Sequence, residues 1–332
     1  MGGKPPIVSA ISGHKQKAII VTGKVPELPS KMLRNVVARG EAGAAWLAQL
    51  PTLVGDLEQR WNIAVGRTMP NGTEAYVAET VSSLGEPGVL KVPIPGTDKA
   101  RRELGVLLAA DGRGYARVLQ HDPASGAMLL ERLGPQLFQL GYPLERQIEI
   151  ICATLGEAWR QPPPHLPLMT GAEKADLLAD TVRSVSWRFE SACSARTVEV
   201  ALRFAEQRRT AFDPVASVLG HGDAHCWNTL ADPATGAFKF VDPEGLFIER
   251  AHDLSISLRE WSDDFLAGDP AGRGRARCDL LARLTGVEAT AIWQWGLLEN
   301  LVNGLLYLDV GADADAAPFL AVAGAWSDVE PI

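Results

Sequence analysis

Three oxygen-bearing side chains in the stretch 217–247 have types and a spacing that suit metal and phosphate chemistry. Asp223 precedes Asn228 in a His-x-Asp-x-x-x-x-Asn pattern, and Asp242 follows an apolar run further on. The intervening Asp-Pro-Ala-Thr-Gly is typical of a turn. A hairpin built on that turn would place Asn228 and Asp242 side by side at its open end, with Asp223 on the loop that leads into it. Such a set could hold Mg²⁺ against a polyphosphate and place a carboxylate base beside it.

The same stretch also allows a different kind of metal site. His221-x-Asp223-x-His225 has the spacing of metal ligands in a zinc hydrolase. The sequence holds no second histidine-rich motif to complete such a site, which would also leave Asn228 and Asp242 without a role. We therefore expect His221 to pack and hydrogen-bond within the loop, and His225 to be structural or to border a bound acceptor.

A lysine inside an apolar segment is the next candidate. Lys91 lies in the strand-like run Val-Leu-Lys-Val, ahead of a helical run over 98–110 that contains Glu103. A lysine on an edge strand could simply extend its amine into solvent, and Glu103 could be a solvated helix residue. A triphosphate, however, needs a fixed cation, which is a role that Lys91 could fill.

Charge argues against a nucleic-acid binder. The chain has 332 residues and a formal net charge of −8, and its basic residues form only short pairs such as Arg101-Arg102. A cationic small molecule is easier to accommodate.

Cysteine usage and hydropathy predict a cytoplasmic protein without a membrane span. The cysteines are scattered without a CxxC pair, which fits a reducing compartment. The N-terminus does not have the pattern of a signal peptide. The most apolar C-terminal stretch, 289–308, contains polar residues such as Gln294 and Glu299, so a buried helix is expected there.

Hydrophobic periodicity divides the chain into a β-rich part and a helical part, which predicts an α+β fold. Helices are expected from Pro29 onward, with a second helical run after Pro51; residues 1–28 are poorly patterned, with 19–21 as a possible short strand. Strands are predicted over 62–69, 75–83, 89–93, 115–120 and 127–133, and a helix over 98–110. The helices expected further on are 144–159, 172–191, 195–210, 253–261, 275–285 and 288–309, with a loop over 268–274.

Taken together, these motifs resemble the aminoglycoside phosphotransferases, which have a protein-kinase-like fold, and most closely their streptomycin and hydroxyurea kinase branch. The resemblance runs from about 30 to 307 and depends on the order and spacing of several runs. Its first half rests on 89–92, 109–114, 118–123 and 129–132. Its second half rests on His-Gly-Asp-x-His-x-x-Asn at 221–228 and Asp-Pro-Glu-Gly at 242–245.

This resemblance implies a bilobal protein. It implies an N-terminal extension with helices over 1–60, an ATP-binding lobe over 61–134 made of a small antiparallel sheet with one helix, and a larger helical lobe over 135–332 with the catalytic loop and acceptor site. It also implies roles for single residues. Lys91 would contact the α- and β-phosphates of ATP and pair with Glu103, and the backbone around Glu131 and Leu133 would bind adenine. Asp223 would be the catalytic base, Asn228 and Asp242 would bind Mg²⁺, and Asp253 would brace the catalytic loop.

Two features depart from the pattern of protein kinases. The turn at 71–74, Asn-Gly-Thr-Glu, is not a GxGxxG loop, although its backbone N–H groups could still cover phosphates. Asp242 is followed by Pro-Glu-Gly instead of Phe-Gly, and no long segment ending in Ala-Pro-Glu comes after it. These differences argue against a phosphorylation-regulated protein kinase.

The acceptor site is predicted from polar residues after the catalytic segment. Carboxylates there would attract a polycationic aminocyclitol, but they could equally form a solvated helix end. Polar groups in the apolar helix 288–309 could face the acceptor or be satisfied between helices. The acceptor candidates are His225, Glu260, Asp263, Asp264 and Glu299, with Asp269 and Asn300 as further possibilities.

The predicted function is that of a monomeric, ATP- and Mg²⁺-dependent O-phosphotransferase acting on a streptomycin-type aminoglycoside and conferring resistance. One alternative is a kinase of the same fold for another antibiotic, a sugar or an amino alcohol. Another is a catalytically silent nucleotide-binding module, against which the presence of Lys91, Asp223, Asn228 and Asp242 together argues.

Overall fold

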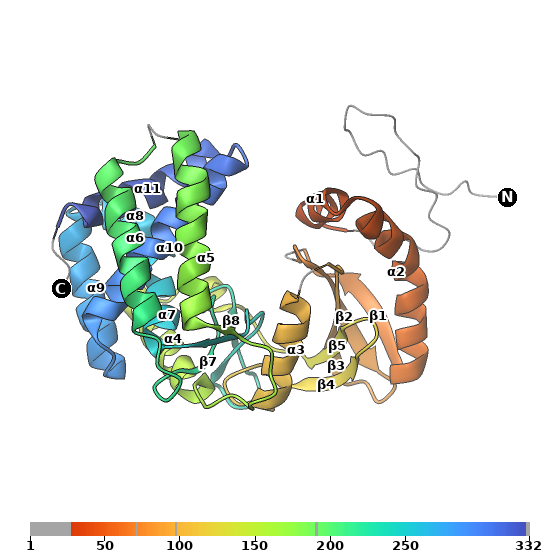
Figure 1. Ribbon diagram of the computed structural model, residues 1–332. Helices are drawn as coiled ribbons and strands as arrows, with labels where there is room; N and C mark the ends of the chain where they lie inside the picture. Colours follow the sequence, from red (N-terminus) through yellow and green to blue (C-terminus); the bar gives the residue numbers. More distant parts are fainter. Residues whose placement is uncertain (1–27, 71, 97, 190–191, 330–332) are drawn as a thin grey trace. The chain divides into compact units, whose positions relative to one another are not determined.

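The computed structural model describes residues 28–70, 72–96, 98–189 and 192–329 (Figure 1). The possible strand at 19–21, and Asn71 of the predicted turn, lie outside these residues. The chain divides into two compact units. The first contains the described residues up to Leu104 together with Arg117–Arg132, and the second contains Gly105–Ala116 and the described residues from Leu133 onward.

The first unit is built on a five-stranded antiparallel sheet in the order β1-β2-β3-β5-β4. The sequence-predicted strands are therefore found, with bounds shifted by a few residues. They are β1 (Ile63–Thr68), β2 (Ala75–Ser82), β3 (Pro87–Pro93), β4 (Val118–Asp122) and β5 (Ala127–Glu131).

Two helices, α1 (Ser30–Ala38) and α2 (Gly40–Trp61), pack on one face of this sheet. The prediction of a new helical run after Pro51 is wrong, because α2 continues through Pro51. Leu50 and Val54, on either side of Pro51, are buried in the core of this unit, and that packing outweighs the hydrogen bond that proline cannot donate. The interruption between the two helices lies instead just before Gly40, whose φ of +56° is readily adopted by glycine.

The alternation of side chains along β3 directs Lys91 away from this core. Leu90 and Val92 are fully buried against α1 and α2, so Lys91 between them points to the opposite face. There α3 (Lys99–Ala110) covers the sheet, as Figure 1 shows. Because β3 pairs with both β2 and β5, Lys91 lies on an interior strand, not on the edge strand that the solvated alternative required.

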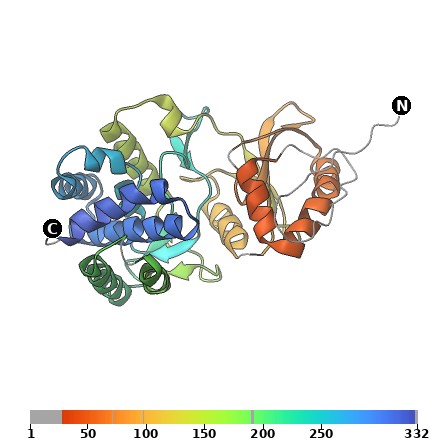
Figure 2. The ribbon, with the colours of Figure 1, turned by 90° about the horizontal axis from the view of Figure 1, so that it is seen from above.

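The second unit is mainly helical, and α10 and α11 pack against each other in it (Figure 2). The α+β class predicted from the sequence is confirmed. The α-helices are α4 (Leu144–Ala158), α5 (Gly171–Ser186), α6 (Ala195–Thr210), α7 (Arg250–Ser255), α8 (Ser262–Leu266), α9 (Pro270–Thr285), α10 (Ala289–Asp309) and α11 (Asp313–Ser327), and the 3₁₀ helices are η1 (Leu137–Leu140), η2 (Trp187–Phe189) and η3 (Ile256–Leu258).

Short strands complete the second unit. A three-stranded sheet has the order β6-β10-β7, and β8 and β9 form a separate two-stranded hairpin. The strands are β6 (Met169–Thr170), β7 (Val218–Gly220), β8 (Thr229–Ala231), β9 (Phe238–Phe240) and β10 (Leu246–Ile248).

The prediction of a loop over 268–274 is wrong, because α9 begins at Pro270. Asp269 caps this helix by accepting the N–H of Ala271, and proline at the first helical position is favourable. Gly274 suggested a loop, but it lies inside the helix and allows Trp326 to pack closely. A Cβ at this position would lie 2.7 Å from the Trp326 ring.

The sequence patterns predict no element beyond residue 309, yet α11 occupies Asp313–Ser327. In the part of the chain that the structure describes, no helix is long and apolar enough to cross a membrane.

Candidate active site

Two neighbouring strands of the second unit carry the loops that contain the predicted catalytic and metal-binding residues. The loop that contains Asp223 follows β7, and the loop that contains Asp242 precedes β10. These strands are antiparallel partners, with Leu246 opposite Gly220. The N–H of Glu244 also donates to the His221 carbonyl at 2.7 Å. The sheet therefore holds the two loops against each other.

The β8–β9 hairpin brings Asn228 close to Asp242, as its turn sequence predicts. Thr229 pairs with Phe240, and the N–H of Val241 donates to the Asn228 carbonyl at 3.0 Å. Asp242 has a φ of +60°, which is uncommon for a residue other than glycine and is often found at functional sites.

Asp253 fixes the start of the loop that contains Asp223. Its carboxylate is fully buried and accepts the N–H groups of His221 at 3.0 Å and Gly222 at 2.7 Å, and the indole N–H of Trp159 at 2.9 Å. Only glycine fits at 222, because φ is +85° and a Cβ would lie 2.9 Å from the side chain of Glu244. Asp253 thus has the bracing position that the resemblance implied.

His221 is committed to the loop on both ring nitrogens. Nδ1 accepts the N–H of Asp223 at 3.0 Å, so Nε2 carries the proton and donates to the Val241 carbonyl at 2.9 Å. Burial lowers the pKa of His221, which keeps the ring neutral. Neither nitrogen is left for a metal, as the zinc alternative would require.

The Asp223 carboxylate is surrounded by donors. Oδ1 accepts from Arg259 Nη2 at 2.5 Å, and Oδ2 accepts from His225 Nε2 at 3.2 Å and Asn228 Nδ2 at 3.3 Å. Burial by itself would raise the pKa of Asp223, but Arg259 and His225 outweigh it and hold the pKa well below its ordinary value. The side chain is therefore ionised.

Arg259 also connects Asp223 to a larger buried ion network around Glu299 of α10. Glu299 lies 3.6 Å from Arg259, 3.4 Å from Lys174 of α5 and 3.1 Å from His252 of α7. Burial would raise the pKa of Glu299, yet Lys174, His252 and Arg259 together lower it. Lys174 in turn lies 3.5 Å from Glu244 in the Asp242 loop, so the network reaches both loops of the site.

The first unit contains a buried ion pair of its own. Lys91 Nζ of β3 donates to Glu103 Oε1 of α3 at 2.5 Å, and both side chains are almost fully buried. This is the pairing that the resemblance implied for these two residues. The pair holds the amine of Lys91 in a fixed place on the sheet.

The chemistry of Asn228 and Asp242 fits Mg²⁺, which prefers oxygen ligands and usually keeps waters and substrate phosphates in its shell. Asn228 donates through Nδ2 to the backbone oxygen of Asp223 at 3.1 Å, which fixes the amide whose Oδ1 could bind the metal. Among the described residues, no group of three or more His, Cys, Asp or Glu side chains could hold a metal ion on its own.

Comparison with known proteins identifies the family. The sequence model of the aminoglycoside/hydroxyurea antibiotic resistance kinases matches residues 60–311, most of the chain. The chain belongs to this family. It is therefore a small-molecule phosphotransferase, as the motifs predicted.

Two relatives named as kinases or phosphotransferases cover nearly the whole protein. A streptomycin 6-kinase of Streptomyces glaucescens is 28% identical over 296 residues, which are 88% of this chain and 94% of the relative. A hydroxyurea phosphotransferase of Kitasatospora aureofaciens is 28% identical over 307 residues, 91% of this chain and 86% of the relative.

A solved structure supports the protein-kinase-like fold. It is a thermostable mutant of an aminoglycoside phosphotransferase in a ternary complex with ADP and hygromycin B, and it aligns with a TM-score of 0.53 at 15% identity. The alignment covers 82% of this kinase and 97% of the other chain.

The other residues singled out in the sequence of this kinase lie in different surroundings. Glu260 is 3.3 Å from Arg259, the residue that contacts Asp223. Asp264 forms ion pairs with Arg273 and Arg277. Asp263 is exposed on α8, and Asn300 is buried and donates to backbone carbonyls.

The residues predicted to hold adenine lie at the end of β5 and beyond. Glu131 is the last residue of β5, and its backbone N–H donates to the Arg117 carbonyl at 3.0 Å. Leu133, in the second unit, is buried.

The sequence motifs of this kinase do not point to Arg259 or Lys174, which connect the carboxylates of the second unit. Arg259 directly precedes Glu260, and Lys174 lies in the first turn of α5. Both are charged residues in helical stretches, where a solvated position is the usual expectation. The available signal was the presence of Glu299 in an otherwise apolar helix, which needs a buried cation.

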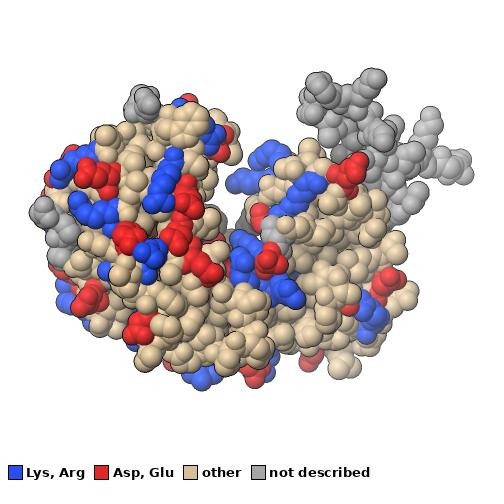
Figure 3. All heavy atoms as spheres, in the orientation of Figure 1, with Lys and Arg blue, Asp and Glu red and all other residues tan. Residues whose placement is uncertain are grey.

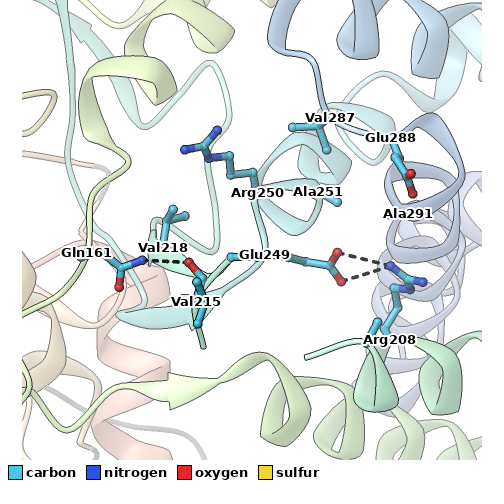
Figure 4. A pocket seen from close by; sticks show the side chains of 12 residues that line it. Gln161, Arg208, Val215, Val218, Glu249, Arg250, Ala251, Val287, Glu288 and Ala291 are labelled. Atoms are coloured by element: carbon cyan, nitrogen blue, oxygen red, sulfur yellow. Dashed lines mark hydrogen bonds and ion pairs between the residues drawn. The ribbon is translucent and has the colours of Figure 1, made fainter. Parts of the chain in front are cut away.

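A separate pocket of about 580 Å³ lies in the second unit (Figure 4). Arg208 and Glu249 form an ion pair in its wall, and Arg250, Val218 and Ala291 also line it. None of the residues predicted to act on a nucleotide, a metal or an acceptor lines this pocket.

Proposed function

We propose that this kinase transfers the γ-phosphoryl group of ATP, with Mg²⁺, to a hydroxyl on the aminocyclitol ring of a streptomycin-type aminoglycoside, and so confers resistance. The observation that carries the proposal is the position of Asp223 beside the Asn228–Asp242 end of the hairpin. The added charge would weaken the drug's binding to acidic RNA.

Asp223 would accept the hydrogen bond of the acceptor hydroxyl and take its proton. Because Arg259 and His225 lower its pKa, Asp223 is ionised but only weakly basic. A weak base suffices in phosphoryl transfer, where the transition state is loose and positioning contributes most of the catalysis. The main task of Asp223 is then to orient the hydroxyl, with proton transfer late in the reaction.

Asn228 and Asp242 would hold Mg²⁺ through their side-chain oxygens. The metal, when bound, neutralises charge on the phosphate oxygens. Lys91 would bind the α- and β-phosphates, with Glu103 keeping its amine in place, and the backbone around Glu131 and Leu133 would bind adenine.

These roles imply a division of labour along the chain. Residues 61–134 would form the nucleotide-binding lobe and 135–332 the catalytic and acceptor-binding lobe, with 1–60 as an extension that contributes helices. We also propose that the enzyme is a monomer and that it acts in the cytoplasm.

A cationic acceptor is supported by the net charge of the chain. The net charge of the chain is −8, and Figure 3 shows acidic side chains interspersed with basic ones over the visible face. His225 and Glu260 remain the best placed of the predicted acceptor contacts because both adjoin Asp223 or its partner Arg259. Asp263 and Asp264 would act at longer range, and Glu299 through Arg259.

A second acceptor deserves equal testing, because one relative is a hydroxyurea phosphotransferase. The decisive measurement is Mg·ATP consumption by the purified protein with streptomycin, other aminoglycosides, hydroxyurea, sugars and amino alcohols. We expect streptomycin to give the largest kcat/KM. Consumption stimulated only by a non-aminoglycoside would overturn the proposed acceptor, and no Mg·ATP binding would overturn the kinase mechanism.

A further inference from the structure

Two aromatic side chains next to the catalytic loop are exposed and stacked on each other. Trp227 is 40% exposed and Phe138, in η1, is 49% exposed. Their ring centroids are 4.0 Å apart, with an interplanar angle of 21°. Exposing this much aromatic surface is unfavourable in water, which gives the pair the character of a binding surface.

The polypeptide holds both rings in place. The Trp227 carbonyl accepts from Gln136 Nε2 at 2.7 Å, and the N–H of Phe138 donates to the Cys226 carbonyl at 3.3 Å. Both contacts join η1 and the residues before it to the catalytic loop. The ring pair is thus organised before any ligand arrives, which reduces the entropy lost on binding.

The pair is also connected to the catalytic carboxylate. Trp227 immediately precedes Asn228, and its N–H donates to His225 Nδ1 at 3.2 Å. His225 Nε2 donates in turn to Asp223. The charged groups close to this loop are Glu260, which is partly exposed, and Arg259, which lies 3.3 Å from Glu260 and donates to Asp223.

We propose that the Phe138–Trp227 pair is an acceptor subsite for a planar, delocalised N–C–N group, a guanidinium or a urea. The proposal rests on the proposed function and specifies which chemical group of the acceptor the enzyme recognises. A guanidinium is planar and weakly hydrated, so it stacks on aromatic faces better than an ammonium does.

The same chemistry is common to the compounds for which the two relatives are named. Streptomycin carries guanidinium groups on its aminocyclitol, and hydroxyurea is itself a planar urea. A flat aromatic surface beside Asp223 would receive either group, whereas an aminoglycoside with ammonium groups alone would gain less from it.

The test compares Trp227→Leu, Trp227→Phe and Phe138→Leu with a matched control, Trp187→Leu. Trp187 is also an exposed tryptophan of this unit, at 66%, but lies in η2. KM is measured for streptomycin and for ATP. We expect Trp227→Leu to raise the KM for streptomycin about tenfold, equivalent to about 1.4 kcal/mol, and Phe138→Leu and Trp227→Phe to raise it less. The KM for ATP and the kinetics of Trp187→Leu should stay within about twofold.

An equal rise in the KM for ATP would show that the pair contacts the nucleotide, and an unchanged KM for streptomycin would show that it contacts neither. Either result overturns the subsite and leaves the proposed function standing. If the unaltered enzyme uses hydroxyurea instead, the proposed acceptor fails, and the same variants must raise the KM for hydroxyurea for the subsite to hold. If it phosphorylates only compounds without a planar N–C–N group, both proposals are overturned.

Discussion

The two units of this kinase stabilise their buried charges in different ways. In the first unit, Lys91 and Glu103 form a compact pair between a strand and a helix. In the second unit, Glu299 forms ion pairs with Lys174, His252 and Arg259. Arg259 also forms an ion pair with Asp223. The pair fixes the amine of Lys91, whereas the network connects the Asp223 carboxylate to helices α5, α7 and α10.

This difference predicts different consequences of removing one charge. Loss of either member of the pair removes the opposite charge that its partner contacts at 2.5 Å, and the effect should be local to the nucleotide side of the reaction. Loss of one member of the network is partly offset by the remaining members but should be felt in global stability, because several helices meet there.

The largest effect is expected at Asp223, the proposed base, which the network contacts through Arg259. Asp223→Asn should lower kcat about 10³-fold, because the amide cannot accept the acceptor's proton. Binding of Mg·ATP, followed by calorimetry, should be almost unchanged. Asp279→Asn, on the exposed side of α9, is the matched control and should keep full activity. Near-normal turnover of Asp223→Asn would show that another group is the base.

Glu299→Gln should destabilise the protein by about 3 kcal/mol at pH 7, because it leaves Lys174 and Arg259 buried with less compensation. The free energy of unfolding is measured by urea denaturation, with Glu199→Gln, exposed on α6, as the control. A loss no larger than that of the control would show that the network does not stabilise the fold.

The pH dependence of stability provides a second check on Glu299. The pKa of Glu299 is lowered in the folded protein, so its contribution is fully present above the unfolded value of about 4.3 and is lost as the pH falls toward the folded value. The free energy of unfolding of the unaltered enzyme should therefore decrease more between pH 6 and pH 3 (about the range of the linkage) than that of Glu299→Gln.

Glu103→Gln tests the pair. We expect kcat/KM for ATP to fall about 30-fold, since a hydrogen bond to a charged group contributes roughly 1.5–3 kcal/mol. The KM for the acceptor should be unchanged, and Glu86→Gln, at an exposed turn of the same unit, should behave like the unaltered enzyme. An equal effect on both substrates would mean that the pair acts on the whole fold, like the network.

The smallest effect is expected for Arg259→Lys, which keeps the charge but loses the planar guanidinium. With a weaker partner, the pKa of Asp223 should rise, and the acid limb of the kcat–pH profile should move to higher pH while kcat at pH 8 falls about threefold (roughly 0.7 kcal/mol). Arg203→Lys on α6 is the control. An unshifted acid limb would show that Arg259 does not set the ionisation of Asp223.

Local patterns predicted much of the fold and half of the candidate site. The strands of the first unit follow from alternation and turn residues, and the hairpin that brings Asn228 to Asp242 follows from its Asp-Pro-Ala-Thr-Gly turn. Lys91 and Glu103 could be singled out because a charge in an apolar strand, followed by a helix with the opposite charge, is visible over a short stretch.

The predictions of secondary structure are wrong where packing against distant residues outweighs the local preference of proline and glycine. Pro51 remains inside α2 because the flanking apolar residues are buried against the sheet, and Gly274 lies inside α9 because two tryptophan rings approach it. The sheet packed against α2 and the tryptophans near Gly274 are both distant in the sequence. Composition alone therefore predicted a helix break at Pro51 and a loop at Gly274.

The sequence by itself determined that the chain has the motifs of a phosphotransferase family, because those motifs are short and are recognised by their order and spacing. Only the tertiary structure decided what the residues of these motifs touch. Arg259 comes from the segment after η3, Lys174 from α5 and Glu299 from α10, and none carries a motif. Their partnership exists because burying a charge is unfavourable unless folding supplies an opposite charge, from wherever in the chain it comes.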